Sequence, residues 1–332
     1  MNVSKFSKNT ADSESTRFSP SPKLGLLIGV LAASTSSIFI RFAQQDAPSI
    51  AIAAYRLGLA TLLLSPFILT RHRRAFRDLP RDAILLAIFS GSILGMHFAL
   101  WIASLEFTSV VSSVTIVQTS PLFVALLSPL ILKESIGRNL VIGIVISFTG
   151  SIIIALSDAC VWEAGLSCPP LSTFFQGKAL QGDLLALGGA VGGALYLLIG
   201  RRLRSRLDLL PYIFLVYGAA ALWLIFTALV TKTPLTGYAP MTFVWFFLLA
   251  LVPQLIAHST YNWVLRYLSA ALVSIALLGE TVASTLWAYW LLDESPPMLR
   301  IGGALLILVG IGIATWRRST QNHISPQATI SE

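Results

Sequence analysis

Long apolar blocks alternate with short polar links along most of the 332-residue chain. Each block approaches the roughly 20 apolar residues that a helix needs to cross a ~30 Å hydrocarbon core. The alternation at strand length that a membrane β-barrel requires is missing. The pattern therefore predicts ten membrane-crossing helices, at residues 24–42, 48–70, 82–103, 109–131, 140–157, 180–200, 209–230, 241–265, 269–292 and 300–316.

The composition supports a helical membrane protein. Hydrophobic residues make up 55% of the chain and charged residues only 11%, whereas soluble domains carry about 25% charged residues. The formal net charge is +8, but the basic residues lie in links between the apolar blocks. Because nucleic-acid binding needs a basic face on a folded module, we expect contact with the lipid bilayer and no nucleic acid.

The basic residues also predict the orientation in the membrane. With the N-terminus inside, 18 of the 23 Lys and Arg residues fall in inner links and tails. Arg56 lies in a span, and four fall outside: Arg41, Lys178, Lys232 and Arg300. Inner links are enriched in Lys and Arg. We therefore expect a multi-pass protein of the bacterial inner membrane, with both termini in the cytoplasm.

Three sizeable segments lie outside the predicted spans: a polar and disordered cytoplasmic tail at 1–22, an extracytoplasmic link at 158–179, and a cytoplasmic tail at 317–332. The chain's two cysteines, Cys160 and Cys168, both fall in the outer link. Two cysteines alone do not complete a four-ligand zinc site, and we expect no metal. They either form a disulfide in an oxidising compartment or remain free thiols.

An internal repeat emerges when the chain is shifted against itself by 160 residues. The shift needs no gap, and it pairs identical glycines and charged or polar residues: Gly29 with Gly189, Arg41 with Arg201, Glu134 with Glu294, Ser135 with Ser295, Gly143 with Gly303, and Gly150 with Gly310. The two copies, at 23–157 and 180–316, hold five spans each, so the second must enter the membrane from the opposite side. The expected fold is an all-α membrane protein of two inverted five-helix repeats, with a site near the midplane between them.

Several of the repeated segments resemble a known family. They are Leu122 to Gly150 with the preceding Pro121, Gly182 to Leu187, and Leu278-Gly279-Glu280 continuing to Asp293-Glu294. In order and spacing they resemble the EamA-type transporters of the drug/metabolite transporter superfamily, over residues 24–316. The resemblance implies carriage of small solutes across the membrane, often outward. This chain departs from it at Thr281, where second copies often have proline, and at Lys133, where first copies often have glycine.

Two charged side chains lie deep within predicted spans, Arg56 in the second and Glu280 in the ninth. A charge at the bilayer centre costs about 2.5–3.5 kcal/mol on insertion scales, so both are expected to face the interior of the bundle. They form a structural ion pair in one interpretation, and line the substrate path in the other. Glu280 is the candidate for proton coupling, because burial alters the proton affinity of a carboxylate.

Other polar and aromatic side chains are candidates for the cavity. His97 and His258 either titrate near neutral pH or stay neutral and bonded to helix carbonyls. Trp101 and Tyr261 correspond under the repeat shift, and act either as gates or as interfacial belt residues. Gln118 and Gln254 lie close to Pro121 and Pro253, where a missing backbone hydrogen bond permits a kink.

The expected function is secondary active transport of small metabolites such as amino acids, most simply as an exporter. No Walker motif is present, and we expect neither cofactor nor catalytic residues. One alternative is a receptor or assembly factor that reuses the fold. Another is an intramembrane enzyme, which is disfavoured because neighbouring His258 and Ser259 diverge by about 100° around a helix. The oligomeric state stays open between monomer and homodimer.

Overall fold

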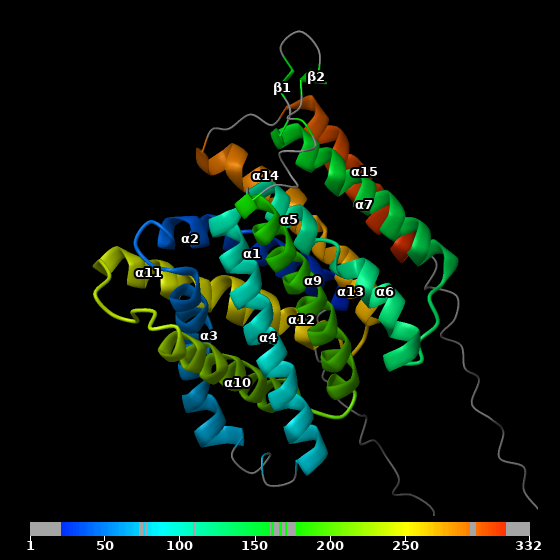
Figure 1. The fold of residues 1–332 in the computed structure, drawn as a ribbon. Helices are drawn as coiled ribbons and strands as arrows, with labels where there is room; N and C mark the ends of the chain where they lie inside the picture. Colours follow the sequence, from blue (N-terminus) through cyan, green and yellow to red (C-terminus); the bar gives the residue numbers. More distant parts are fainter. Residues whose placement is uncertain are drawn as a thin grey trace, which may run out of the picture.

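The structure is a computed structural model. It describes residues 21–72, 76, 79–108, 110–159, 161–162, 166–167, 170, 177–292 and 297–316. Within these ranges the protein is a bundle of helices, with one short hairpin of β1 (Val161–Trp162) and β2 (Leu166–Ser167), which pair antiparallel (Figure 1). Cys160 and Cys168 lie outside the described residues, so their predicted disulfide stays a prediction.

The helices of the first half are α1 (Pro22–Ala33), α2 (Ser36–Ala43), α3 (Ser49–Phe67), the π-helix η1 (Ile68–His72), α4 (Arg81–Phe107), α5 (Val110–Val117), α6 (Ser120–Ile131) and α7 (Arg138–Ala159). Those of the second half are α9 (Gly177–Arg204), α10 (Leu209–Val230), α11 (Pro240–Leu249), the π-helix η3 (Ala250–His258), α12 (Ser259–Val264), α13 (Ala270–Leu277), α14 (Gly279–Leu292) and α15 (Met298–Thr315). Several of these elements continue one another end to end.

The predicted membrane fold is confirmed. Within the described residues, nine continuous or jointed helices are long and apolar enough to cross a bilayer, and a tenth, Arg138–Ile154, is apolar but shorter. Their outward faces carry exposed large hydrophobic side chains, among them Leu62, Leu126, Leu222 and Leu229. Such faces are unfavourable in water and match the hydrocarbon of a bilayer.

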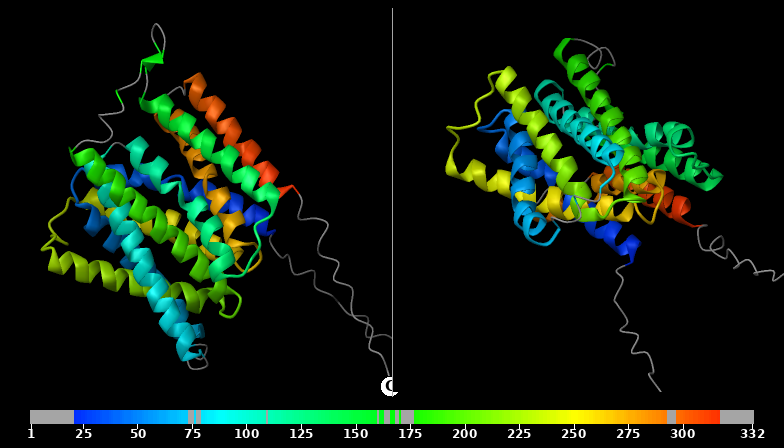
Figure 2. Two further views of the ribbon diagram at one scale, coloured as in Figure 1. Left: turned by 45° about the vertical axis from the view of Figure 1, so that its right-hand side comes forward. Right: turned by 90° about the horizontal axis from the view of Figure 1, so that it is seen from below.

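The two halves are inverted about a pseudo-twofold axis, which is clearest where α7 packs along α15 (Figures 1 and 2). A Cβ added to Gly143 would lie 2.5 Å from the Gly310 carbonyl oxygen, and one added to Gly150 would lie 2.6 Å from that of Gly303. The repeat shift makes Gly143 equivalent to Gly303 and Gly150 equivalent to Gly310, so each glycine meets a member of the other equivalent pair. The two equivalent helices therefore run antiparallel, as inverted halves require.

Trp101 and Tyr261, which correspond under the repeat shift, each pack against the opposite half. Trp101 on α4 lies against Gly189 on α9, where an added Cβ would be 3.3 Å from the Trp101 Cβ. Tyr261 on α12 lies against Gly29 on α1, where an added Cβ would be 2.6 Å from the Tyr261 ring. Glycine permits this close approach. Each half thus packs an aromatic side chain on the first helix of the other half.

Three of the predicted continuous spans are broken in the structure, which corrects the expectation from hydropathy. The first breaks at Ser34–Thr35, the fourth at Gln118–Thr119 and the ninth at Leu278. Pro121 enters the first turn of α6, where a missing N–H is tolerated. The fourth and ninth spans break at equivalent positions of the repeat, and Pro253 lies inside η3 rather than at a break.

Candidate functional site

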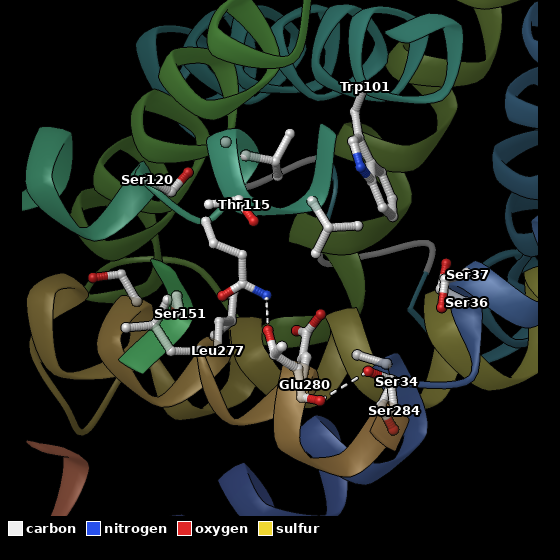
Figure 3. A pocket seen from close by; sticks show the side chains of 18 of the residues that line it. Ser34, Ser36, Ser37, Trp101, Thr115, Ser120, Ser151, Leu277, Glu280 and Ser284 are labelled. Carbon is white, nitrogen blue, oxygen red and sulfur yellow. Dashed lines mark hydrogen bonds between the residues drawn. The ribbon is translucent and has the colours of Figure 1, made fainter. Parts of the chain in front are cut away.

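A cavity of about 690 Å³ lies between the two halves. Ser34, Gln118 and Leu278 all line it, so each of the three helix breaks borders the same space. Its volume is typical of sites that enclose a small organic ligand. Much of the wall carries serine and threonine hydroxyls, including those of Ser34, Ser36, Thr115, Ser120, Thr281 and Ser284 (Figure 3).

The structure gathers most of the predicted site residues around this cavity. Those that line it are Arg56, His97, Trp101, Gln118, His258, Tyr261 and Glu280, contributed by both halves. Gln254 is fully buried behind them and reaches the site through Arg56. Their roles in binding stay predictions, but their convergence from distant parts of the chain is a property of the fold.

Arg56 is held by neutral groups rather than by a carboxylate. Its Nε donates to Gln254 Oε1 at 2.8 Å, and its Nη1 donates to Ser36 Oγ at 2.9 Å. The guanidinium carbon lies 4.1 Å from the centre of the Phe98 ring, which adds a cation–π contact. Arg56 is 1% exposed, and it makes no ion pair with Glu280 within the described residues. The two charges are therefore not in direct contact, and both interpretations of their role stay predictions.

Glu280 stands at the beginning of α14, in its first turn. The Tyr261 hydroxyl donates to Glu280 Oε1 at 2.9 Å. A negative charge is favoured near a helix N-terminus because the backbone N–H groups there point toward it. Figure 3 shows the Glu280 side chain reaching into the cavity, with Trp101 on the opposite wall.

Gln118 connects the break in the fourth span to the ninth span. Its Nε2 donates to Thr281 Oγ1 at 2.7 Å. Its Oε1 is buried and has no hydrogen-bond partner within the described part of the chain. Sequence reasoning identified Thr281 only as a departure from a proline pattern and missed this contact. The two residues are 163 positions apart, and no local pattern indicates their meeting.

The two histidines lie on an aromatic wall of the cavity. His97 Nδ1 donates to the Gly189 carbonyl at 2.7 Å, and the imidazole stacks on Trp101 with ring centres 6.1 Å apart. His258 meets Phe98 edge-on, with ring centres 5.4 Å apart. These contacts give one side of the cavity an aromatic surface.

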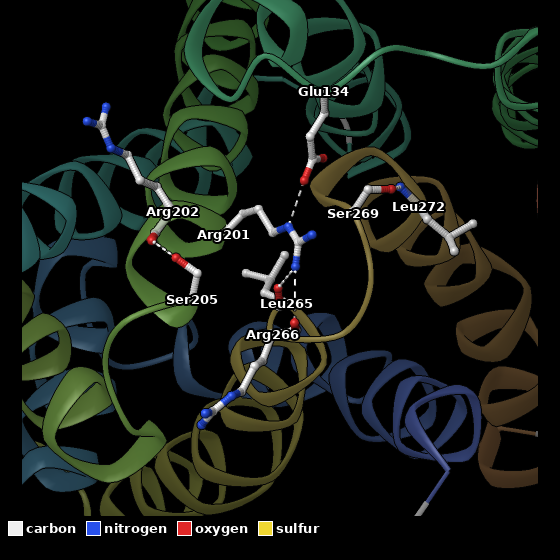
Figure 4. A network of polar contacts seen from close by, with 8 residues as sticks. All are labelled: Glu134, Arg201, Arg202, Ser205, Leu265, Arg266, Ser269 and Leu272. Atoms are coloured by element: carbon white, nitrogen blue, oxygen red, sulfur yellow. Dashed lines mark hydrogen bonds and ion pairs between the residues drawn. The ribbon is translucent and has the colours of Figure 1, made fainter. Parts of the chain in front are cut away.

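A network of polar contacts joins the two halves at one end of the bundle (Figure 4). Arg201 Nε and Glu134 Oε1 form an ion pair at 2.9 Å. The same guanidinium donates to the Leu265 carbonyl at 2.6 Å and to the Arg266 carbonyl at 3.2 Å. These residues come from the link after α6, the last turn of α9 and the link after α12. We call the four of them the closing network.

The opposite end of the cavity has a different lining. Arg41, the repeat equivalent of Arg201, is exposed there, and Pro297 at the beginning of α15 is exposed beside the same space. At the same end, Asp46 accepts hydrogen bonds from Thr242 Oγ1 at 2.7 Å and from the Ala239 N–H at 2.8 Å. These donors lower the pKa of Asp46 below its ordinary value, with the Thr242 bond as the larger cause.

Comparisons with known proteins agree with this architecture. A protein of Archaeoglobus fulgidus named as an uncharacterized transporter is 26% identical over 283 residues, which are 84% of this chain and 93% of that protein. Human solute carrier family 35 member G1 is 24% identical over 317 residues, 93% of this chain and 84% of that protein. A solved crystal structure with 17% sequence identity matches 89% of this chain and 96% of its own with a TM-score of 0.71, which shows the shared fold.

The model of the EamA-like transporter family matches residues 22–156 and again residues 180–316. The two matches cover most of the chain and coincide with the two inverted halves. They support a multi-pass membrane transporter of small molecules rather than an intramembrane enzyme. With its twofold match, its inverted halves and the cavity between them, this chain belongs to the EamA-like transporter family.

Proposed function

We propose that this protein is a secondary active exporter of amino acids or similar small metabolites, working by alternating access. The observation that carries the proposal is the asymmetry of the cavity between two inverted halves. The Glu134–Arg201 pair closes one end, whereas the equivalent Arg41 is exposed at the other. Inverted halves that rock about the site would exchange these two arrangements.

The positions of the Lys and Arg residues along the sequence support an assignment of the side of the membrane that this conformation faces. With both termini in the cytoplasm of a bacterial cell, the closing network lies on the cytoplasmic side. The described conformation then faces outward, with its cavity accessible from the exterior. Export requires the opposite state, in which the network opens and the cavity takes up a solute from the cytoplasm.

Glu280 is the residue we propose for proton coupling. It is a carboxylate inside the membrane, it lines the cavity, and it has no ion-pair partner within the described residues. A group in this position reaches both sides in turn during alternating access. Proton binding and release at Glu280 would link solute movement to the proton gradient.

Counterflow in proteoliposomes tests the proposal. Vesicles preloaded with one unlabelled solute from a panel are mixed with the same solute in labelled form, and uptake by wild type is compared with that by E280Q. We expect at least one amino acid or related metabolite to exchange, and the variant to lose the pH dependence of that exchange. Absence of exchange by folded protein for every solute would contradict transport of this class. Unchanged pH dependence in E280Q would remove Glu280 from the coupling.

A further inference from the structure

Two side chains that line the cavity, Glu280 and Gln118, each have an oxygen that accepts no hydrogen bond within the described residues. Glu280 Oε1 accepts from Tyr261, and within the described residues no hydrogen bond is donated to its other carboxylate oxygen. Gln118 Oε1 is likewise buried without a donor. The Gln118 amide donates from Nε2 to Oγ1 of Thr281, the residue after Glu280, at 2.7 Å, and both Gln118 and Glu280 line the same cavity.

Glu280 is the only carboxylate among the described residues that line the cavity, and none of the arginines of that lining forms an ion pair with it. A carboxylate inside a membrane protein is unfavourable unless a cation or a proton neutralises it. Arg56 does not supply that cation directly, because its guanidinium is 1% exposed and bonded to Gln254 and Ser36. Within the described residues, Glu280 therefore has no direct cationic partner.

We propose that the deep part of the cavity is an ammonium subsite, in which Glu280 binds the amine cation of the substrate and Gln118 Oε1 accepts one of its N–H bonds. The inference rests on the proposed transport function and names the substrate class for it. The class is small primary and secondary amines, and it includes amino acids through their α-ammonium group. Carboxylates without an amine lie outside it.

The wall facing Glu280 indicates what the rest of such a substrate is like. Trp101 lies opposite Glu280 across the cavity (Figure 3) and stacks on His97. Phe98 lies beside them, with its ring centre 4.9 Å from that of His97. Aromatic faces bind apolar groups and also attract cations. An amine with an apolar or aromatic body therefore matches both walls at once.

An organic anion is the competing class of ligand, because Arg41 lines the outer end of the cavity. Arg41 is exposed, and an exposed charge is weakened by water and salt. In the deep part Arg56 is already bonded to Gln254 and Ser36, whereas the second carboxylate oxygen of Glu280 and the Gln118 Oε1 accept no hydrogen bond within the described residues. Depth and bonding therefore favour the amine over the anion.

Binding to the purified full-length protein tests the subsite apart from transport. The probes are 2-phenylethylamine, its N-acetyl derivative and 3-phenylpropionate, which share a phenyl body and differ in charge. Isothermal titration at neutral pH should show that the amine binds and that the other two bind at least about tenfold more weakly, the effect of losing one charged hydrogen bond. E280Q should weaken amine binding by a similar factor, and Q118L should weaken it several-fold.

The control variant is Asp82→Asn, which removes an exposed carboxylate outside this cavity and should leave amine binding unchanged. Failure of the amine to bind wild type, equal binding of the N-acetyl compound or the carboxylate, or undiminished amine binding by E280Q would each overturn the subsite. If E280Q does not fold, the comparison of the three probes on wild type decides alone. Counterflow of a solute without an amine would overturn the subsite while leaving the transport function intact.

Discussion

Removal of Glu134 should open the closed end of the cavity more often. In Glu134→Gln the Arg201 guanidinium keeps its bonds to the Leu265 and Arg266 carbonyls but loses the 2.9 Å ion pair. The two side chains of the pair are 24% and 28% exposed, so solvent screens part of the interaction. Its contribution should therefore lie near the upper end of values for accessible pairs, about 1 kcal/mol. That energy changes a two-state population about fivefold, since 1.4 kcal/mol is a factor of ten.

Thiol accessibility measures this change. Ser274 is buried on α13 and lines the cavity, so Ser274→Cys in a background without Cys160 and Cys168 reports on access to the site. We expect an impermeant thiol reagent, added from the side of the closing network, to label the Glu134→Gln variant about fivefold faster than its parent.

Asp82→Asn is the matched control for this prediction. It disrupts an ion pair with Arg206 at 4.0 Å in which the two side chains are 66% and 75% exposed. An exposed pair of this length contributes little, so labelling should stay at the parental rate. Equal rates in the Glu134 and Asp82 variants would refute the assignment of the Glu134–Arg201 pair to closure.

Three further predictions concern stability, each measured by thermal unfolding in detergent. Gly303→Ala should destabilise the protein by about 1–3 kcal/mol, because the added Cβ would lie 2.7 Å from a carbonyl oxygen of α7. Gly302→Ala, with open space around the added Cβ, should not destabilise it. Equal unfolding temperatures of the two variants would refute this packing. Gln254→Leu should cost about 1.5–3 kcal/mol by leaving Arg56 without its Nε acceptor, and Gln254→Glu should retain most of the stability; a stable leucine variant would contradict it. The pKa of Asp46 is lowered in the folded protein, so its contribution to folding stability is present above the pKa of an unfolded aspartate and is lost as pH falls through the folded pKa. Asp46→Asn should therefore remove a small acid-dependent loss of stability. Identical stability profiles of variant and wild type in acid would contradict this role of Asp46.

The membrane fold could be predicted almost entirely from the sequence, because the apolar blocks that cross the lipid and the internal repeat can both be read along the chain. Hydropathy measures transfer into hydrocarbon, which differs little between a continuous helix and one interrupted at a single turn. Hydropathy therefore gave no sign of the break at Leu278, and near Gln118 only Pro121 indicated that the helix could kink. The repeat shift identified Gly143 and Gly303 as equivalent, but only the structure shows that Gly143 packs on Gly310 and Gly303 packs on Gly150.

The sequence predicted which residues line the site, but not which of them bond to one another. The cost of a charge in lipid indicates that Arg56 must find polar partners, but it does not distinguish Glu280 from a set of neutral acceptors. The structure uses Gln254, 198 residues away, and Ser36, 20 residues away. The Gln118–Thr281 bond and the closing network likewise depend on tertiary packing, which places residues far apart in sequence within hydrogen-bonding distance.

Trp101 packs on Gly189, and its repeat equivalent Tyr261 packs on the equivalent Gly29. This symmetry has a consequence for the relative free energies of the two transport states. If the two halves were identical in sequence, the inward-facing and outward-facing states would be related by the twofold axis and would have equal free energy. Any resting bias must then come from positions where the halves differ under the repeat shift, such as tryptophan against tyrosine at this pair and Gln118 against Leu278 at the helix breaks. Exchanging the residues of such a pair between halves should move the bias toward the opposite state. The mismatches of the repeat, rather than its identities, thus encode which side the empty carrier prefers to face.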